Sequence, residues 1–227
     1  MKNLFKELTL FERGLWITSL VVVTLSFLLV PNKDYLTLCA SLIGVTALIF
    51  VAKGYVIGQV LCVVFAVFYG IISFYFKYYG ELITYLFMSA PMAIMSVISW
   101  IRHPYKGTKE VEVNRMTKKQ VGVMLAITVI ITIVFYFILD VLHTANIVFS
   151  TISISTSFVA VYMTYMRSPY YAIGYSLNDI VLIVLWVLAS IENPAYIPMI
   201  ICFIMFLAND IYGFVNWRRI EQKQYNI

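Results

Sequence analysis

The chain has 227 residues, of which 62% are apolar and only 12% are charged, and it carries a formal net charge of +5. Its mean hydropathy is strongly positive, which excludes a soluble domain, because a water-soluble core of this length needs a much larger polar shell. The three cysteines stand alone in apolar runs, a pattern that excludes a disulfide framework and a zinc site and predicts no metal or cofactor.

Eight apolar runs are long enough, or nearly so, to cross the roughly 30 Å of bilayer hydrocarbon. They are unbroken and show no sustained alternation of apolar and polar residues, so they are expected to be helices. The sequence therefore predicts an all-α polytopic membrane protein with eight spans. In chain order the runs are 14–30, 35–52, 55–76, 81–101, 120–139, 145–166, 170–190 and 195–216.

The first run follows several basic residues and so resembles a signal peptide. No small-x-small cleavage site follows it, however, since the chain continues Leu28-Leu29-Val30-Pro31. Residues 3–13 offer Leu4, Phe5, Leu8 and Phe11 to lipid headgroups and are expected to lie at the membrane interface. We therefore expect residues 1–31 to form an interfacial segment and one extra N-terminal helix.

Residues 53–102 resemble residues 170–219 at a constant offset of 117. This offset pairs Trp100 with Trp217, and Tyr69 with Trp186. It predicts two three-helix repeats joined by a linker helix. Corresponding helices are separated by four crossings, so the repeats run parallel, a plan typical of transporters with a substrate site between the repeats. The expected boundaries are a first repeat at 35–102, an inner loop and linker helix at 103–144, a second repeat at 145–219 and an inner tail at 220–227.

The basic residues predict the orientation of the chain. With both termini inside, fourteen Lys and Arg residues fall on the inner side, and only Lys33 and Lys77 fall on the outer side. We therefore expect a multi-pass protein of the bacterial inner membrane with both termini in the cytoplasm. The positive net charge reflects this topology and does not indicate binding of nucleic acid.

Amides and carboxylates are concentrated in the second repeat. Asn178-Asp179 replaces Leu61-Cys62 of the first repeat, and Asn209-Asp210 replaces Met92-Ala93. Because an ionisable group in hydrocarbon costs about 2.5–3.5 kcal/mol, such a group normally faces a cavity or a partner. Amides suit hydroxyl groups, and aromatic rings stack on flat cationic heterocycles. The predicted substrate contacts are Gln59, Tyr175, Asn178, Asp179, Trp186, Asn209 and Tyr212.

The sequence also predicts roles for three tryptophans and for Asp210. Trp186 is expected to act as a lid toward the outside, whereas Trp100 and Trp217 are expected to anchor the chain in the interfacial belt. Asp210 could pair with Arg218 or Arg219, and no acidic pair suggests a site for a coupling ion. The alternative for all the polar residues is that they lock helices together in a receptor or structural protein.

The segment Tyr171–Trp186 and the ending Asn-x-x-Tyr-Gly-x-x-x-Trp at 209–217 resemble the PnuC family of vitamin transporters. The resemblance covers residues 35–219 and implies a fold like that of the SWEET sugar carriers. It implies no enzymatic activity, but passive exchange of nicotinamide riboside, with net uptake driven by a cytosolic nicotinamide riboside kinase. Other relatives carry thiamine, riboflavin or deoxynucleosides.

Several alternatives stay open within that resemblance. Tyr85 and Met92 stand where some relatives have amide side chains, so the substrate could instead be thiamine or another nucleoside-like vitamin. Asp179 could couple transport to a proton. The partners expected are the small-molecule substrate and the lipid bilayer, and assembly into a homo-oligomer is left open.

Overall fold

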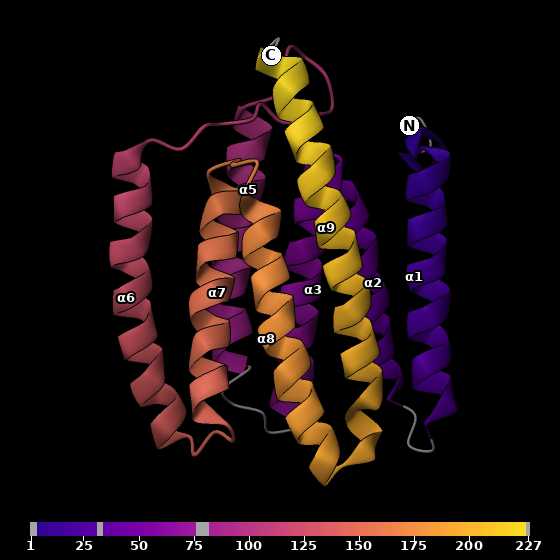
Figure 1. The fold of residues 1–227 in the computed structure, drawn as a ribbon, viewed down its shortest axis with the longest axis vertical. Coiled ribbons are helices and arrows are strands. Elements are labelled where there is room, and N and C mark those ends of the chain that lie inside the picture. Colours follow the sequence, from indigo (N-terminus) through magenta and orange to yellow (C-terminus); the bar gives the residue numbers. More distant parts are fainter. Residues whose placement is uncertain (1–3, 31–33, 76–81, 226–227) are drawn as a thin grey trace.

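Long helices that run side by side along one axis form the fold (Figure 1). The computed structural model describes residues 4–30, 34–75 and 82–225, and within these ranges the regular structure is helical apart from two isolated β-bridges. The elements are η1 (Leu4–Glu7), α1 (Leu10–Leu29), α2 (Tyr35–Ala52), α3 (Val56–Tyr75), η2 (Thr84–Ser89), α5 (Ala90–Arg102), α6 (Lys118–Val141), α7 (Ile147–Tyr165), α8 (Tyr171–Glu192), η3 (Pro194–Tyr196) and α9 (Ile197–Tyr225).

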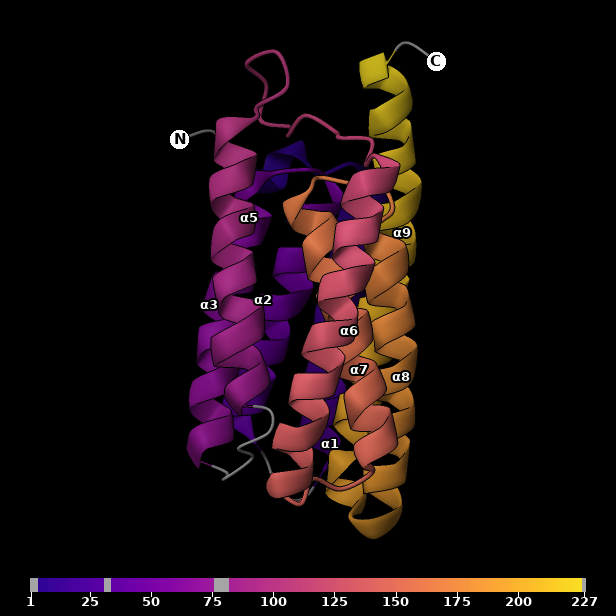
Figure 2. The same ribbon diagram turned by 90° about the vertical axis from the view of Figure 1, so that its left-hand side faces the viewer.

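The prediction of an all-α polytopic membrane protein is confirmed. By length and composition, seven of the described helices can cross a membrane, and Val56–Ile71 is a shorter apolar helix. Both termini and the loop between α5 and α6 lie at the same end of the bundle, here called the inner end (Figures 1 and 2). Lys33 and Lys77, the two basic residues expected on the outer side, lie outside the described residues, as does the turn at 79–81.

The helix boundaries depart from the predicted runs at both ends of the chain. The first helix begins at Leu10, because the Thr9 side chain accepts from the Glu12 backbone while the Glu12 carboxylate accepts from the Thr9 backbone N–H, which forms a capping box. The last helix continues to Tyr225, through the segment expected to be a tail. That extension matters because it places charged residues of α9 beside the start of α1.

A π-helical turn, η2, precedes α5. Pro91 has no N–H to donate to the carbonyl four residues earlier, and its ring crowds that carbonyl. The chain widens locally, so that the Ala90 N–H donates to the Tyr85 carbonyl five residues back. Such turns are frequently found at functional sites, and this one carries Tyr85 and Ser89 toward the centre of the bundle.

Two pairs of side chains link the helices reciprocally at the inner end. Trp100 of α5 donates to the carbonyl of Thr164 at the end of α7, and Trp217 of α9 donates to that of Val51 at the end of α2, each at 2.9 Å. The residues that precede them repeat the pattern, since Ser99 donates to Tyr165 and Asn216 donates to Ala52. The ends of α5 and α9 thus donate to carbonyls at the ends of α7 and α2, and the carbonyls of Val51 and Thr164 also accept backbone N–H groups of the turns that follow.

These contacts correct the expectation that Trp100 and Trp217 are belt anchors. Both indoles are fully buried, and their rings lie 5.4 Å apart. A belt residue keeps its N–H at the wet interface, whereas these two N–H groups find buried carbonyl acceptors inside the protein. Val111 and Val113 of the α5–α6 loop pack into the same apolar cluster and close the inner end of the bundle.

The extra helix α1 is held to both neighbouring helices by one buried carboxylate. Glu12 is 1% exposed, accepts from Lys53 at 3.0 and 3.1 Å and accepts from the Tyr212 hydroxyl at 2.7 Å. Further along α1, on the same side of the helix, Ser19 accepts from the Asn209 amide at 3.0 Å. Glu12 therefore connects α1 to the end of α2 and to α9 at the same point.

Removal of the Glu12 carboxylate should destabilise the protein by about 3–5 kcal/mol, because it leaves the nearly buried Lys53 ammonium without its counter-charge. We expect Glu12→Ala to lower Tm strongly in detergent, as followed by intrinsic fluorescence. The double variant Glu12→Gln/Lys53→Met, which removes both charges, should recover most of the loss. Glu112→Ala, at an exposed position, is the control. Equal Tm values for Glu12→Ala and the control would contradict this role.

Candidate functional site

A cavity of about 120 Å³ lies in the middle of the bundle. Each of the six helices of the two predicted repeats contributes to its wall, and η2 contributes as well, whereas α1 and α6 do not. The cavity therefore lies among helices α2, α3, α5, α7, α8 and α9. Its lining residues are Gly44, Ala47, Leu48, Val51, Gln59, Cys62, Phe65, Ala66, Tyr85, Ser89, Ala93, Ser96, Ser157, Val161, Tyr175, Asn178, Asp179, Leu182, Phe203, Phe206 and Asp210.

Asn178 presents a fixed amide to this cavity from α8. Its carbonyl oxygen accepts from the hydroxyls of Thr156 at 2.9 Å and Ser157 at 3.0 Å, both on α7. The two hydroxyls hold this end of the amide against α7. The amide nitrogen makes no hydrogen bond with the described residues, so it is available as a donor to a molecule in the cavity.

Two carboxyl groups meet at the cavity wall. Asp179 of α8 and Asp210 of α9 are each 3% exposed, and their side chains lie within hydrogen-bonding reach of one another. One oxygen of Asp179 is buried and has no hydrogen-bond partner. Among the described residues that line the cavity there is no Lys or Arg, so the wall carries acidic groups with no basic counterpart.

This acidic pair corrects two sequence expectations. Asp210 does not pair with Arg218 or Arg219, because it lies on the face of α9 that carries Phe203 and Phe206 toward the cavity. Arg218 pairs with Glu221 instead. An acidic pair suited to a cation or a proton does exist, and it was missed because its members come from different helices.

Four of the seven predicted contacts line the cavity: Gln59, Tyr175, Asn178 and Asp179. Gln59 is 3% exposed and has no hydrogen-bond partner among the described residues. Phe65, Tyr85, Phe203 and Phe206 join them as lining aromatic residues that the sequence analysis did not select. For Phe203 and Phe206 the signal was their three- and four-residue spacing with Asp210, which places all three on one face of α9.

The structure does not bring Trp186, Asn209 and Tyr212 to the cavity. Trp186 packs against Tyr196, with ring centroids 5.5 Å apart, in the apolar cluster of the outer half. Asn209 and Tyr212 project from the other side of α9 and bond to α1 through Ser19 and Glu12. The sequence placed all polar residues of α9 in one cavity, but the helix carries two polar faces.

Packed apolar clusters lie toward both ends of the cavity. The outer cluster includes Phe65, Tyr85 and Leu182, and the inner cluster includes Val51 and Trp217. The free volume lies below the roughly 300–1,000 Å³ that is typical of ligand pockets. A ligand of nucleoside size would therefore have to displace side chains of the wall in order to bind.

Comparisons with known proteins agree with this architecture. The sequence profile described as "Nicotinamide mononucleotide transporter" matches residues 34–219, which run from the start of α2 to α9 and leave α1 outside. A protein of Neisseria mucosa, "Nicotinamide riboside transporter PnuC", is 25% identical, in a match that covers 98% of this chain and 86% of the relative. A solved structure described as "Crystal structure of the Vitamin B3 transporter PnuC" superimposes with a TM-score of 0.83 at 25% identity and covers 97% of this chain and 96% of that chain.

Proposed function

We propose a substrate and a mode of transport on the premise that this chain belongs to the PnuC family, the nicotinamide mononucleotide transporter family of membrane proteins. It is a transporter and not an enzyme. Its proposed activity is passive exchange of nicotinamide riboside across the bacterial inner membrane, with both termini in the cytoplasm. A cytosolic kinase that phosphorylates the riboside would then drive net uptake.

The observation that carries the substrate proposal is the charge of the cavity. Two carboxyl groups and several aromatic rings line it, and no described lining residue is basic. A pyridinium ring is flat and cationic, so it suits both the carboxyl pair and the rings. A phosphate group would be brought close to two acidic side chains without a cation to receive it, and this favours the riboside over the mononucleotide.

The proposed contacts follow from this chemistry. Asn178 and Gln59 would bind hydroxyl groups of the ribose, because both offer buried amides at the wall. Tyr175 would stack on the heterocycle, and Asp179, with its unpaired oxygen, would lie near the positive ring. Thiamine is also a flat cation, and this geometry supports it as the runner-up substrate.

We infer that the two units are related by a two-fold axis along the membrane normal. The reciprocal bonds at the inner end support this relation, because Trp100 and Trp217 make the same contact to opposite units. The family match, which begins at residue 34, supports the assignment of α1 as an addition outside the repeats. The substrate cavity between the units is where a carrier with parallel repeats is expected to bind.

Calorimetry on the purified protein tests the substrate. Nicotinamide riboside should bind, and the mononucleotide and the uncharged riboflavin should bind far more weakly. Asp179→Asn should weaken binding of the riboside by about 10- to 100-fold, the size expected for a hydrogen bond or close contact to a charged group. Asp140→Asn, an exposed carboxylate on α6, is the control and should bind as the unmodified protein does. Binding of thiamine without binding of the riboside would refute the substrate assignment.

A second test narrows the cavity. A Cβ added at Gly44 would lie 2.6 Å from the ring of Phe206 and 3.3 Å from that of Phe65, so Gly44→Ala should crowd the space that a substrate needs. Overpacking of about 1–3 kcal/mol would lower uptake of radiolabelled riboside into proteoliposomes by roughly 5- to 150-fold. Gly122→Ala, where a Cβ meets nothing within 4 Å, should leave uptake unchanged. Equal uptake by the two variants would place the transport path elsewhere.

The acidic pair favours one alternative, a proton-coupled carrier. Two neighbouring carboxyl groups in a buried site can share a proton, which makes Asp179 and Asp210 candidates for coupling. Our proposal of passive exchange predicts that riboside reaches the same final level in proteoliposomes with and without an imposed pH gradient. Accumulation above the external concentration that requires the gradient, and that is lost in Asp210→Asn, would establish the alternative instead.

A further inference from the structure

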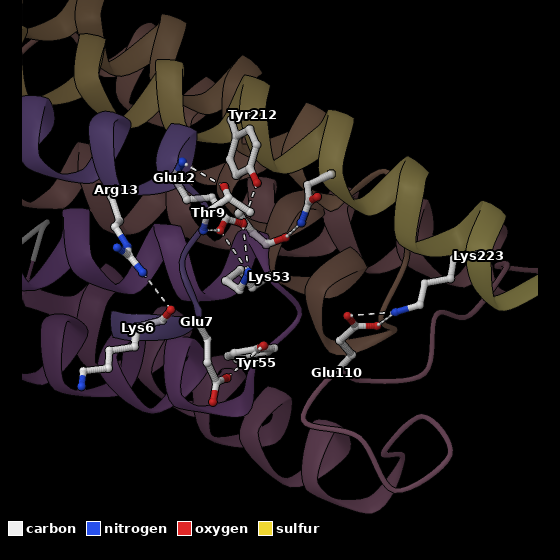
Figure 3. Close-up of polar contacts among 12 residues, drawn as sticks. Lys6, Glu7, Thr9, Glu12, Arg13, Lys53, Tyr55, Glu110, Tyr212 and Lys223 are labelled. Atoms are coloured by element: carbon white, nitrogen blue, oxygen red, sulfur yellow. Dashed lines mark hydrogen bonds and ion pairs between the residues drawn. The ribbon is translucent and has the colours of Figure 1, made fainter. Parts of the chain in front are cut away.

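A groove of about 780 Å³ lies away from the central cavity. It runs between the start of α1 and the inner end of α9, and Figure 3 shows the polar side chains that gather there. Its lining residues are Thr9, Phe11, Glu12, Leu15, Lys53, Glu110, Ala208, Ile211, Tyr212, Val215, Asn216, Arg219, Ile220 and Lys223.

One face of α9 gives this groove an amphipathic wall. Ile211, Val215, Arg219 and Lys223 follow one another at intervals of four residues, so they form a stripe along the helix. The two apolar members, both exposed, come first, and the two cationic members lie nearer the inner end. Phe11 of α1 faces this wall, with its ring centroid 5.3 Å from that of Tyr212.

The charges in the groove leave one cation uncompensated. Lys53 pairs with Glu12 at 3.0 Å, and Lys223 pairs with Glu110 at 3.3 Å (Figure 3). Arg219 is exposed and makes no hydrogen bond or ion pair with the described residues. Since the Lys223 side chain is largely exposed and its ion pair is therefore weak, Lys223 can also turn toward a second anion.

We propose that this groove binds an anionic phospholipid. An acyl chain lies along Phe11, Ile211 and Val215, and the phosphate is held by Arg219, with Lys223 beside it. The order of the stripe, apolar toward the bilayer and cationic at the inner end, matches the order of the parts of a lipid. Positive charge predicts that this end faces the cytoplasm, where anionic headgroups are exposed. The proposal does not depend on which solute the central cavity carries.

Native mass spectrometry on the full chain tests the proposal. The protein is purified in a neutral detergent, stripped of lipid, and titrated with phosphatidylglycerol or with phosphatidylcholine that carries the same acyl chains. We expect one tightly held phosphatidylglycerol, bound about fivefold or more tightly than phosphatidylcholine. Arg219→Gln should remove about fivefold of that preference, the contribution expected of one basic residue near an anionic headgroup.

Two controls distinguish a lipid site from general attraction of anions and from a site for free phosphate. Lys119→Gln removes an exposed charge at the start of α6 and should keep the preference, so an equal loss in both variants would mean attraction by net charge alone and would overturn the proposal. Inorganic phosphate should not displace the lipid; if it does, the apolar wall plays no part and the lipid assignment is wrong. Equal binding of the two lipids, or an Arg219→Gln effect only on association between copies of the chain, would also overturn it.

Discussion

Within the hydrocarbon of a bilayer a buried polar group cannot form hydrogen bonds to water. Each such group must therefore bind a partner inside the protein or face a cavity. That constraint orders the whole structure. The carboxylate of Glu12 is fully engaged by Lys53, Tyr212 and Thr9, and the effect is to attach α1. The indole N–H groups of Trp100 and Trp217 are likewise engaged, and they join α5 to α7 and α9 to α2. Within the described part of the chain, the buried carboxyl oxygen without a partner belongs to Asp179 at the wall of the central cavity, and the other buried polar side-chain atoms without one are the hydroxyl of Ser190 and the amide oxygen of Asn209.

The helix α9 shows how one segment can both hold a neighbouring helix and line the cavity. Asn209 and Tyr212 are directed to α1, whereas Phe206 and Asp210 line the cavity, although all four lie within seven residues. A helix turns by about 100° per residue, so adjacent polar residues can point to different neighbours. The Asn-Asp pair at 209–210 is therefore divided between two roles, and the similar pair at 178–179 is not, because both of its members line the cavity.

Much of the fold could be predicted from the sequence because the hydrophobic requirement of a span is local and repetitive. The helices, the extra α1 and the position of Asn178 and Asp179 near the middle of a span follow from the lengths of apolar runs alone. Which side of each helix points to the cavity could not be predicted, because it depends on which neighbouring helix packs against it. For this reason the sequence suggested an ion pair of Asp210 with Arg218 or Arg219, and a position of Trp100 and Trp217 at the membrane interface.

The same reciprocal contacts that support a two-fold relation also bear on how the cavity could open. Trp100 and Trp217 lie against each other on its inner side, and each is bonded to the opposite unit. Opening toward the inner end would therefore separate α5 from α7 and α2 from α9, and it would break the bonds that Ser99, Trp100, Asn216 and Trp217 donate to four helix-end carbonyls. Those carbonyls would be released where the loop and water meet rather than in hydrocarbon, so water could replace the lost donors. Placing these bonds at the inner end links the helices there without making their separation prohibitive.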